Sequence, residues 1–266
     1  MNKASQARTE LLNMEELASG TSFIHGLHPL TKLLVTILYI IVCVSFPKYS
    51  LSGLAVMVLY PVFVYQASGI PVSTCFYKLR FVLPLVMAVG VVNPFLDTAP
   101  LLYIGGLAVR GGVVSMLTLM LKGVFALMAS FILIATTKAD AVCAALRKLH
   151  IPDIIVTLFL LTYRYISVLI EQVAVMSDAY ALRAPNQKGI HISAWGSFLG
   201  QLLLRSMDRA TELYQSMQLR GFRGEFFYAD TAPAALRDAV FAIASATLFF
   251  TARYVDIASA IGGLFM

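Results

Sequence analysis

The amino-acid sequence predicts an all-α, polytopic helical membrane protein with about five transmembrane helices and long cytoplasmic helices. Of its 266 residues, 59% are hydrophobic and only 13% are charged, and the mean hydropathy is +0.80. Soluble domains typically carry about 25% charged residues. Several apolar runs also approach the ~20 residues that a helix needs to cross a bilayer. These observations together place the chain among helical membrane proteins.

The formal net charge of +6 is best interpreted as a signal for orientation and lipid-surface contact. We expect no nucleic-acid partner. The first 20 residues are polar and lack the apolar region of a cleavable signal peptide. The cysteines Cys43, Cys75 and Cys143 are scattered without a CxxC pair, which is typical of packing residues and predicts no disulfide framework.

The first three predicted spans occupy residues 29–46, 51–65 and 81–95. Lys32, close to the start of the first span, can snorkel to the membrane surface. Pro84 interrupts the third span, which membrane helices tolerate when neighbours satisfy the freed carbonyls.

The fourth predicted span runs over residues 113–136, after a loop that contains Asp97, Pro100 and Arg110. Lys122 lies well inside this span, and an ionisable residue within a membrane is a functional candidate by default. The alternative is that Lys122 faces other helices or snorkels past them. No acidic residue in the spans is an obvious partner for it.

The charge pattern predicts four segments: a cytoplasmic N-terminal segment at 1–28, transmembrane helices at 29–136, a cytoplasmic module at 137–233, and a C-terminal transmembrane helix and tail at 234–266. Ten of the twenty Lys and Arg residues lie between residues 137 and 230, with eight Asp and Glu residues. The positive-inside rule therefore places this module in the cytoplasm. With four preceding spans the N-terminus is also cytoplasmic, whereas Lys48 and Arg110 lie outside.

The first long helix of the module should run over residues 153–183, after Pro152. Its first half is almost apolar enough to be a span, but Arg164 interrupts it. We expect a helix that lies against or partly within the bilayer, and a true span is the alternative.

The second long helix of the module begins near Ser193, an N-cap candidate, and ends at Gly221, a C′ glycine. About 28 residues of helix measure roughly 42 Å. Arg205 and Arg209 lie on its polar face. Its apolar face follows helical spacing and comprises Trp195, Phe198, Leu199, Leu202, Leu203, Ala210, Leu213, Tyr214 and Met217.

The last apolar segment, residues 239–252, is bounded by Arg237, Asp238 and Arg253. It is short for a span, so we expect snorkelling residues at its ends to help it cross.

The familiar enzymatic signatures are missing from the sequence. It contains no GxxxxGK[ST] phosphate loop, no GxSxG, no HExxH and no pair of intramembrane carboxylates. His25 and His28 stand three residues apart, but no third metal ligand is near them. We therefore predict no catalytic residues, no metal site, no cofactor bound by this chain and no enzymatic activity.

Two arginine-tipped helix ends carry the most information about function. The first reads Leu182-Arg183-Ala184, followed by a proline, and the second reads Leu219-Arg220-Gly221. A cation at a helix C-terminus gains about 0.3–1 kcal/mol from the helix dipole, which alone would explain one such end. On two long helices, a rigidly held guanidinium fork also suits carboxylates in a partner's groove.

The chain resembles the transmembrane (T) component of energy-coupling-factor (ECF) transporters, especially the cobalt/nickel subgroup. The resemblance covers nearly the whole chain and includes the stretches "HGLHPLTKLL", "TTKADAVCAALRKLHIPD", "YRYISVLIEQ" and "SMQLRGFRGEF". In that family, two Ala-Arg-Gly-like motifs end the cytoplasmic coupling helices and dock into two ABC-type ATPase subunits. This sequence has Ala184 where Gly or Ser often follows the arginine, and Leu219 where Ala often precedes it.

The resemblance implies that Arg183 and Arg220 dock the ATPases, together with Leu182, Ala184, Leu219 and Gly221. The chain would be a non-catalytic scaffold in the plasma membrane of a prokaryote. The partner ATPases would bind ATP, and a separate membrane subunit would bind a cobalt or nickel ion. The alternatives are a T component for a vitamin substrate, or a self-sufficient carrier or channel, for which Lys122 and Asn93 are the candidate residues.

Overall fold

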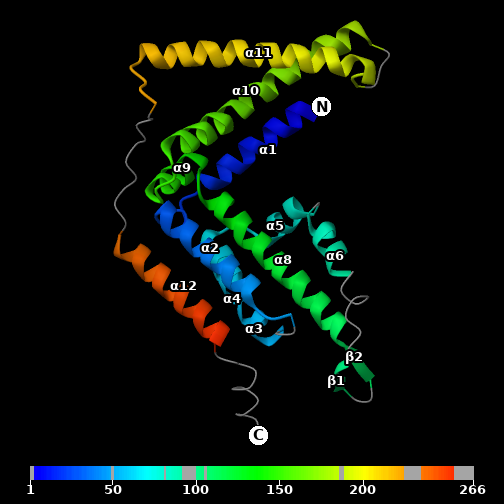
Figure 1. Ribbon diagram of the computed structural model, residues 1–266, viewed down its shortest axis with the longest axis vertical. Helices are drawn as coiled ribbons and strands as arrows, with labels where there is room; N and C mark the ends of the chain where they lie inside the picture. The colour runs from blue at the N-terminus through cyan, green and yellow to red at the C-terminus, as the bar shows by residue number, and fades with distance from the viewer. Residues whose placement is uncertain are drawn as a thin grey trace. The chain divides into compact units, whose positions relative to one another are not determined.

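The structure is a computed structural model that describes residues 3–48, 51–80, 82–91, 100–104, 107–185, 189–224 and 235–254. It is an all-α helical membrane protein, apart from one short hairpin (Figure 1). The chain forms two compact units. Unit 1 comprises Met1–Leu17 and Lys138–Thr231, and unit 2 comprises Ala18–Thr137 and Ala232–Met266.

Unit 2 contains most of the apolar helices. Its helices are α2 (Pro29–Ser45), α3 (Leu51–Val56), α4 (Leu59–Ser68), α5 (Val72–Leu79), α6 (Leu83–Val91), α8 (Gly111–Thr136) and α12 (Leu236–Tyr254). The strands β1 (Pro100–Ile104) and β2 (Leu107–Arg110) pair antiparallel, within the segment predicted to be a loop. The predicted helices at 29–46, 113–136 and 239–252 are confirmed. Part of the predicted span at 81–95, including Asn93, lies outside the described residues, as does Asp97.

The core of unit 2 is an aromatic cluster between α2, α4 and α12. Tyr39 and Phe249 are fully buried, and Tyr60 is 5% exposed. The ring centroid of Tyr39 lies 4.7 Å from that of Tyr60 and 5.2 Å from that of Phe249. Tyr60 and Phe249 meet edge to face at 5.0 Å. Edge-to-face and tilted contacts of this kind stabilise aromatic pairs beyond the area that they bury.

The predicted span at 51–65 is formed by two helices, because Met57 and Val58 make a turn between α3 and α4. Pro61 explains the break: it has no N–H, and its ring would clash with the carbonyl four residues earlier, which belongs to Met57. The hydroxyl of Tyr39 instead donates to that carbonyl at 3.0 Å. The buried Met57 carbonyl therefore keeps a partner although the helix cannot supply one.

Lysines cap both C-terminal ends of the α2–α8 pair. The Nζ atom of Lys122 donates to the carbonyls of Val44, at 3.0 Å, and Phe46, at the end of α2. The Nζ atom of Lys32 donates to the carbonyl of Thr136, the last residue of α8, at 2.7 Å. Lys32 is only 6% exposed, so the prediction that it snorkels was wrong. Each helix thus supplies the cation that satisfies terminal carbonyls of the other.

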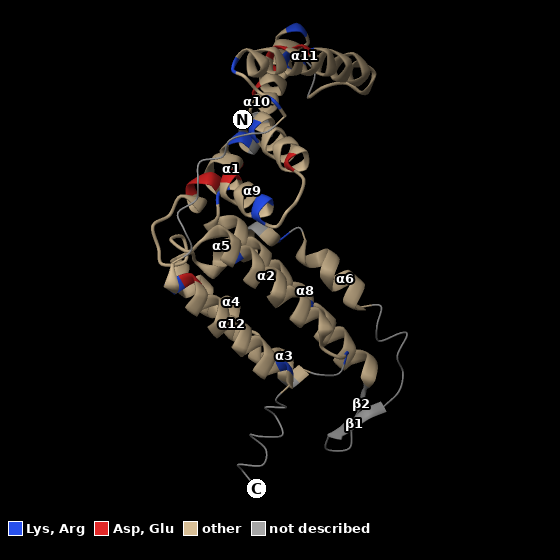
Figure 2. Cartoon of the chain, turned by 60° about the vertical axis from the view of Figure 1, so that its left-hand side comes forward, with Lys and Arg blue, Asp and Glu red and all other residues tan. Residues whose placement is uncertain are grey.

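Unit 1 contains α1 (Lys3–Ala18), α9 (Ala139–Lys148), α10 (Asp153–Arg183) and α11 (Ile192–Leu219). Charged residues concentrate on these helices, as the blue and red segments of Figure 2 show. The helix predicted to begin after Pro152 is confirmed, and Arg147 pairs with Asp153 at 2.8 Å. The α1 helix contacts α10 through Arg8 and Glu171, at 3.9 Å, both of which are exposed.

Two helices in the described part of the chain are long and apolar enough to cross a membrane. They are α8, with a mean hydropathy of 2.2, and α10, with 1.8. The α2 helix and the helical segment Gly53–Ser68, which includes α4 and most of α3, are apolar but shorter. The α10 helix thus has the length and the apolar composition that the alternative, a true span, requires.

Candidate functional site

The second arginine tip is built by a Schellman motif at the end of α11. Gly221 has a φ of +81°, which an L side chain would adopt only under strain. The N–H of Phe222 donates to the carbonyl of Met217 at 3.0 Å, and that of Gly221 donates to Gln218 at 2.9 Å. These are the two hydrogen bonds of the motif, so the predicted C′ glycine is confirmed. Arg220 is the C-cap residue.

The first arginine tip ends differently. Arg183 is the last residue of α10, and Ala184 is the C-cap residue, with its N–H donating to the carbonyl of Tyr180 at 3.0 Å. Pro185 follows, which disfavours the helical conformation of Ala184 and removes a backbone donor. The two helices therefore place an arginine at their C-terminal ends by different local means.

Most residues of both arginine tips are exposed on the surface of unit 1. Leu182 is 84% exposed and Leu219 is 89% exposed. Arg183, Arg220 and Gly221 are exposed as well, whereas Ala184 is half-buried. Among the described residues no ion pair involves either tip arginine, although Arg8, Arg147 and Arg209 pair with carboxylates. Each tip thus presents a guanidinium beside an exposed leucine.

The length of α11 separates the two tips. The N–H of His191, just before α11, donates a hydrogen bond at 3.3 Å to the hydroxyl oxygen of Tyr180, in the last turn of α10. The first tip therefore lies close to the beginning of α11, and the second lies at its end (Figure 1). A helix of 28 residues measures about 42 Å. The two tips are therefore separated by about the length of this helix.

The N-cap of α11 is His191, not Ser193 as predicted. The Nδ1 atom of His191 accepts a hydrogen bond from the N–H of Ser193 at 3.3 Å. An imidazole nitrogen here does what a serine oxygen does at an ordinary N-cap. The helix consequently begins two residues earlier than a Ser193 cap implies, at Ile192.

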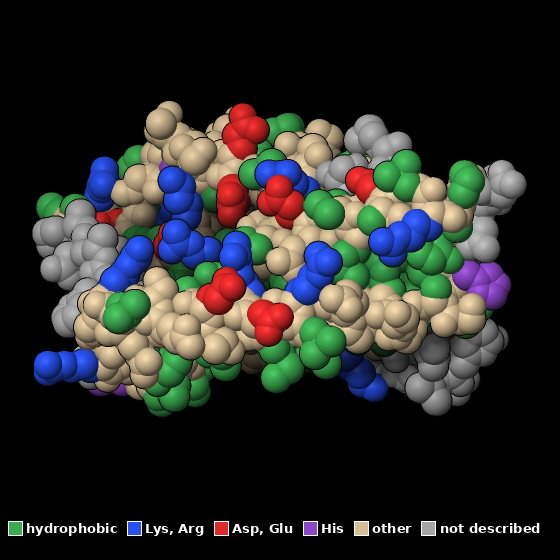
Figure 3. All heavy atoms as spheres, turned by 90° about the horizontal axis from the view of Figure 1, so that it is seen from above, with side chains coloured by type: hydrophobic (Ala, Val, Ile, Leu, Met, Phe, Trp, Pro, Cys, Tyr) green, Lys and Arg blue, Asp and Glu red, His purple; other side chains and the backbone are tan. Residues whose placement is uncertain are grey.

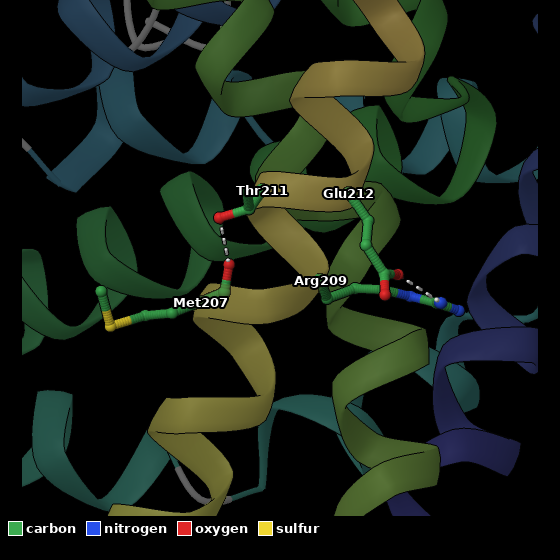
Figure 4. A network of polar contacts seen from close by, with 4 residues as sticks. All are labelled: Met207, Arg209, Thr211 and Glu212. Atoms are coloured by element: carbon green, nitrogen blue, oxygen red, sulfur yellow. Dashed lines mark hydrogen bonds and ion pairs between the residues drawn. The ribbon is translucent and has the colours of Figure 1, made fainter.

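The polar face of α11 is solvated, as predicted. Arg209 and Glu212 form an ion pair at 3.4 Å, with side chains that are 53% and 67% exposed (Figure 4). On the same stretch, the hydroxyl of Thr211 donates to the carbonyl of Met207 at 3.0 Å. Exposed pairs of this kind contribute only about 0–1 kcal/mol to stability.

Much of the apolar face of α11 remains uncovered. Phe198 is buried, but Leu199, Leu203 and Tyr214 are each more than half exposed. In the face drawn in Figure 3, hydrophobic side chains lie among basic and acidic ones. Leu199 and Leu203 are one helical turn apart, so their exposed side chains lie on the same side of α11.

Lys122 and the histidines complete the set of residues singled out in the sequence. Lys122 caps α2 through two carbonyls, which is a structural contact in unit 2. His28 caps the start of α2, because its Nδ1 atom accepts from the N–H of Leu30 at 3.1 Å. In the described ranges, no group of three or more His, Cys, Asp or Glu residues could hold a metal ion.

The sequence did not reveal the importance of Asp238, which was noted only as a flank of the last helix. The structure buries it to 3% exposure and gives both of its carboxylate oxygens backbone partners. One local signal was available: Asp238 is the third residue of α12, where a carboxylate can reach back to the N-cap N–H.

Comparison with known proteins assigns the chain to a family. Residues 20–228 match the family described as CbiQ, cobalt transport protein. The cobalt transport protein CbiQ of Rhodobacter capsulatus is 32% identical over 106 residues, which cover 39% of this chain and 43% of that protein. The nickel permease LarQ of Lactiplantibacillus plantarum is 30% identical over 91 residues, covering 34% of this chain and 33% of the permease.

An uncharacterized protein of Methanocaldococcus jannaschii is 28% identical over 113 residues, which cover 41% of this chain and 38% of that protein. The aligned parts therefore span less than half the length of each of these relatives. The family match, by contrast, extends over most of this chain. The chain thus belongs to the CbiQ family of cobalt transport proteins, the cobalt/nickel-type transmembrane components of ECF transporters.

Proposed function

We propose that this chain is the membrane scaffold of an ATP-driven importer for cobalt or nickel ions. Two ABC-type ATPase subunits dock at Arg183 and Arg220, and a separate membrane subunit binds the metal ion. The observation that carries the proposal is the pair of exposed arginine tips, one at the end of α10 and one at the end of α11. The similarity to a cobalt transport protein and a nickel permease supports the choice of metal.

The chemistry of each tip suits an acidic groove on a partner. A guanidinium group presents five donors in a rigid fork that binds a carboxylate through two parallel hydrogen bonds. Leu182 and Leu219 add an exposed apolar side chain directly before each arginine. An apolar anchor beside a desolvated charge is a common combination at the centre of an interface. Binding at both tips makes the second contact intramolecular, which raises the overall affinity.

The test is the double substitution Arg183→Glu with Arg220→Glu, examined by co-purification with the ATPase subunits. Truncating one partner of a buried charge pair typically costs about 2–5 kcal/mol, and reversing its charge adds repulsion. We expect the double variant to lose the ATPases while it remains folded and monodisperse. Arg183→Ala or Arg220→Ala alone should weaken assembly and lower ATP hydrolysis in liposomes, because the remaining tip retains part of the affinity.

Arg209→Ala is the matched control, since Arg209 lies on the same helix in an exposed ion pair. It should leave assembly and ATP hydrolysis nearly unchanged. Normal assembly and normal ATP hydrolysis by the double Glu variant would show that the tips are only helix caps. Uptake of radiolabelled cobalt and nickel by the complete complex then distinguishes metal import from the import of a vitamin. Uptake by this chain alone would favour a self-sufficient carrier.

A further inference from the structure

The chain passes between units 1 and 2 at three places, and one polar cluster of unit 2 joins the three helix ends that are nearest to these places along the chain. The passages follow Leu17, Thr137 and Thr231. Within unit 2, the helix ends that lie closest to them along the chain are the start of α2, the end of α8 and the start of α12. We call Lys32, Thr136 and Asp238, with the backbone of His28 and Ala235, the anchor cluster.

Asp238 joins the beginnings of two helices. Its Oδ1 atom accepts a hydrogen bond at 2.8 Å from the N–H of His28, the N-cap residue of α2. Its Oδ2 atom accepts one at 2.7 Å from the N–H of Ala235, just before α12. The N-terminal ends of helices attract negative charge, so one carboxylate stabilises both. Next to it, Arg237 donates to the carbonyl of Gly26 at 2.7 Å, which ties α12 to the same loop.

Lys32 joins the end of α8 to the same cluster. Its Nζ atom donates to the carbonyl of Thr136 at 2.7 Å and to that of His25 at 3.4 Å. The start of α2 therefore contacts the end of α8 through a cation and the start of α12 through an anion.

The two charged side chains of the anchor cluster are buried and therefore need hydrogen-bond partners within the protein. Lys32 is 6% exposed and Asp238 is 3% exposed, so both charges are almost completely removed from solvent. Charges in such surroundings are stable only when each is fully hydrogen-bonded, and removing one partner leaves the other uncompensated. A rearrangement that separates α2, α8 and α12 at this end is therefore strongly disfavoured.

We propose that the anchor cluster makes the ends of α2, α8 and α12 move as one body, so that a movement of unit 1 reaches all three membrane helices together. The inference rests on the proposed coupling function, because it concerns how movement at the ATPases is passed to the membrane helices. Lys32 and Asp238 are positioning residues in this view, and they act through the three helix ends. Substitution of either residue should therefore uncouple ATP hydrolysis from transport while the ATPases stay bound.

The experiment compares Asp238→Asn and Lys32→Met with the unmodified complex, assembled with its ATPases and its metal-binding subunit in liposomes. Both variants should co-purify with the ATPases and hydrolyse ATP. Cobalt or nickel uptake per ATP hydrolysed should fall about tenfold, within the roughly 5- to 150-fold range of coupling free energies. Lys32→Arg keeps the donor and the charge and should restore most of the ratio. Lys138→Met, at an exposed lysine, is the matched control and should not change it.

If a variant does not assemble, a second measurement on the unmodified complex tests the same inference. Hydrogen exchange at the amides of His28 and Ala235 should be slow both without nucleotide and with a non-hydrolysable ATP analogue. The inference is overturned if ATP opens one of these segments alone, or if assembled variants keep the normal ratio of uptake to hydrolysis. Loss of the proposed function looks different, because the unmodified chain would then not bind the ATPases at all.

Discussion

At the scale of single residues, Lys122 lies in the middle of α8 and caps the C-terminal end of α2. Lys122→Met removes the donor to the carbonyls of Val44 and Phe46. Phe46 is only 4% exposed, and leaving its carbonyl without a donor costs about 1–3 kcal/mol, so we expect the thermal unfolding midpoint of the purified protein to fall by several degrees. Lys122→Arg keeps a donor at this position, so its unfolding midpoint should stay close to that of the unmodified protein. An unchanged midpoint for the Met variant would show that the cap does not contribute to stability.

Cys143 gives a second prediction at this scale. The thiol is fully buried on α9, and burial raises its pKa, with a further contribution from the negative charge of Asp140. A raised pKa lowers the fraction of thiolate at neutral pH, and the thiolate is the nucleophile. Maleimides should therefore label Cys143 slowly in the native protein and rapidly after unfolding in detergent. Fast labelling of the native protein, measured by mass spectrometry, would contradict the burial.

At the scale of elements, the break between α3 and α4 depends on Pro61 and Tyr39 together. Tyr39→Phe should destabilise the protein by about 1–3 kcal/mol, because the Met57 carbonyl loses its donor. Pro61→Ala supplies a backbone N–H that can form the helical hydrogen bond to that carbonyl. The double variant should therefore be more stable than the sum of the single changes predicts, as measured by a double-mutant cycle. Strict additivity would argue against a shared carbonyl.

The elements also show which signals in the sequence are local. The end of α11 could be predicted because the Schellman motif needs only the residues from Met217 to Phe222. The break between α3 and α4 was missed, although Pro61 marks it, because apolar spacing continues through it. His191 was overlooked as an N-cap because serine is the usual residue there.

At the scale of the whole molecule, the charge distribution predicts the topology. Gln6 on α1 and Gln215 on α11 are exposed, and both should lie in the cytoplasm. Cysteines at these positions should resist a membrane-impermeant maleimide in intact cells and react in inside-out vesicles. Lys48→Cys should show the opposite behaviour. The three native cysteines are buried, which keeps the background low. Labelling of Gln215→Cys from outside would reverse the assignment.

The fold class and the arginine tips could be predicted from the sequence because both depend on composition and on neighbouring residues. The anchor cluster could not. Lys32 and Thr136 are 104 residues apart, and His28 and Asp238 are 210 residues apart. Contacts at such separations are set by how helices pack, which no local pattern reports. A membrane sequence also places apolar residues all round a helix, so periodicity does not show which face meets a neighbour.

The lysine caps at the two ends of the α2–α8 pair constrain how the gene can change in length. Lys32 stands 14 residues before Phe46, and Lys122 stands 14 residues before Thr136. Both intervals measure about 21 Å along a helix. Deleting one residue within either interval shortens it by about 1.5 Å and turns the remainder by about 100°, which removes one lysine from its carbonyl. Insertions and deletions should therefore survive in relatives only when both intervals change together and by a heptad, which keeps each helix within about 20° of its original phase.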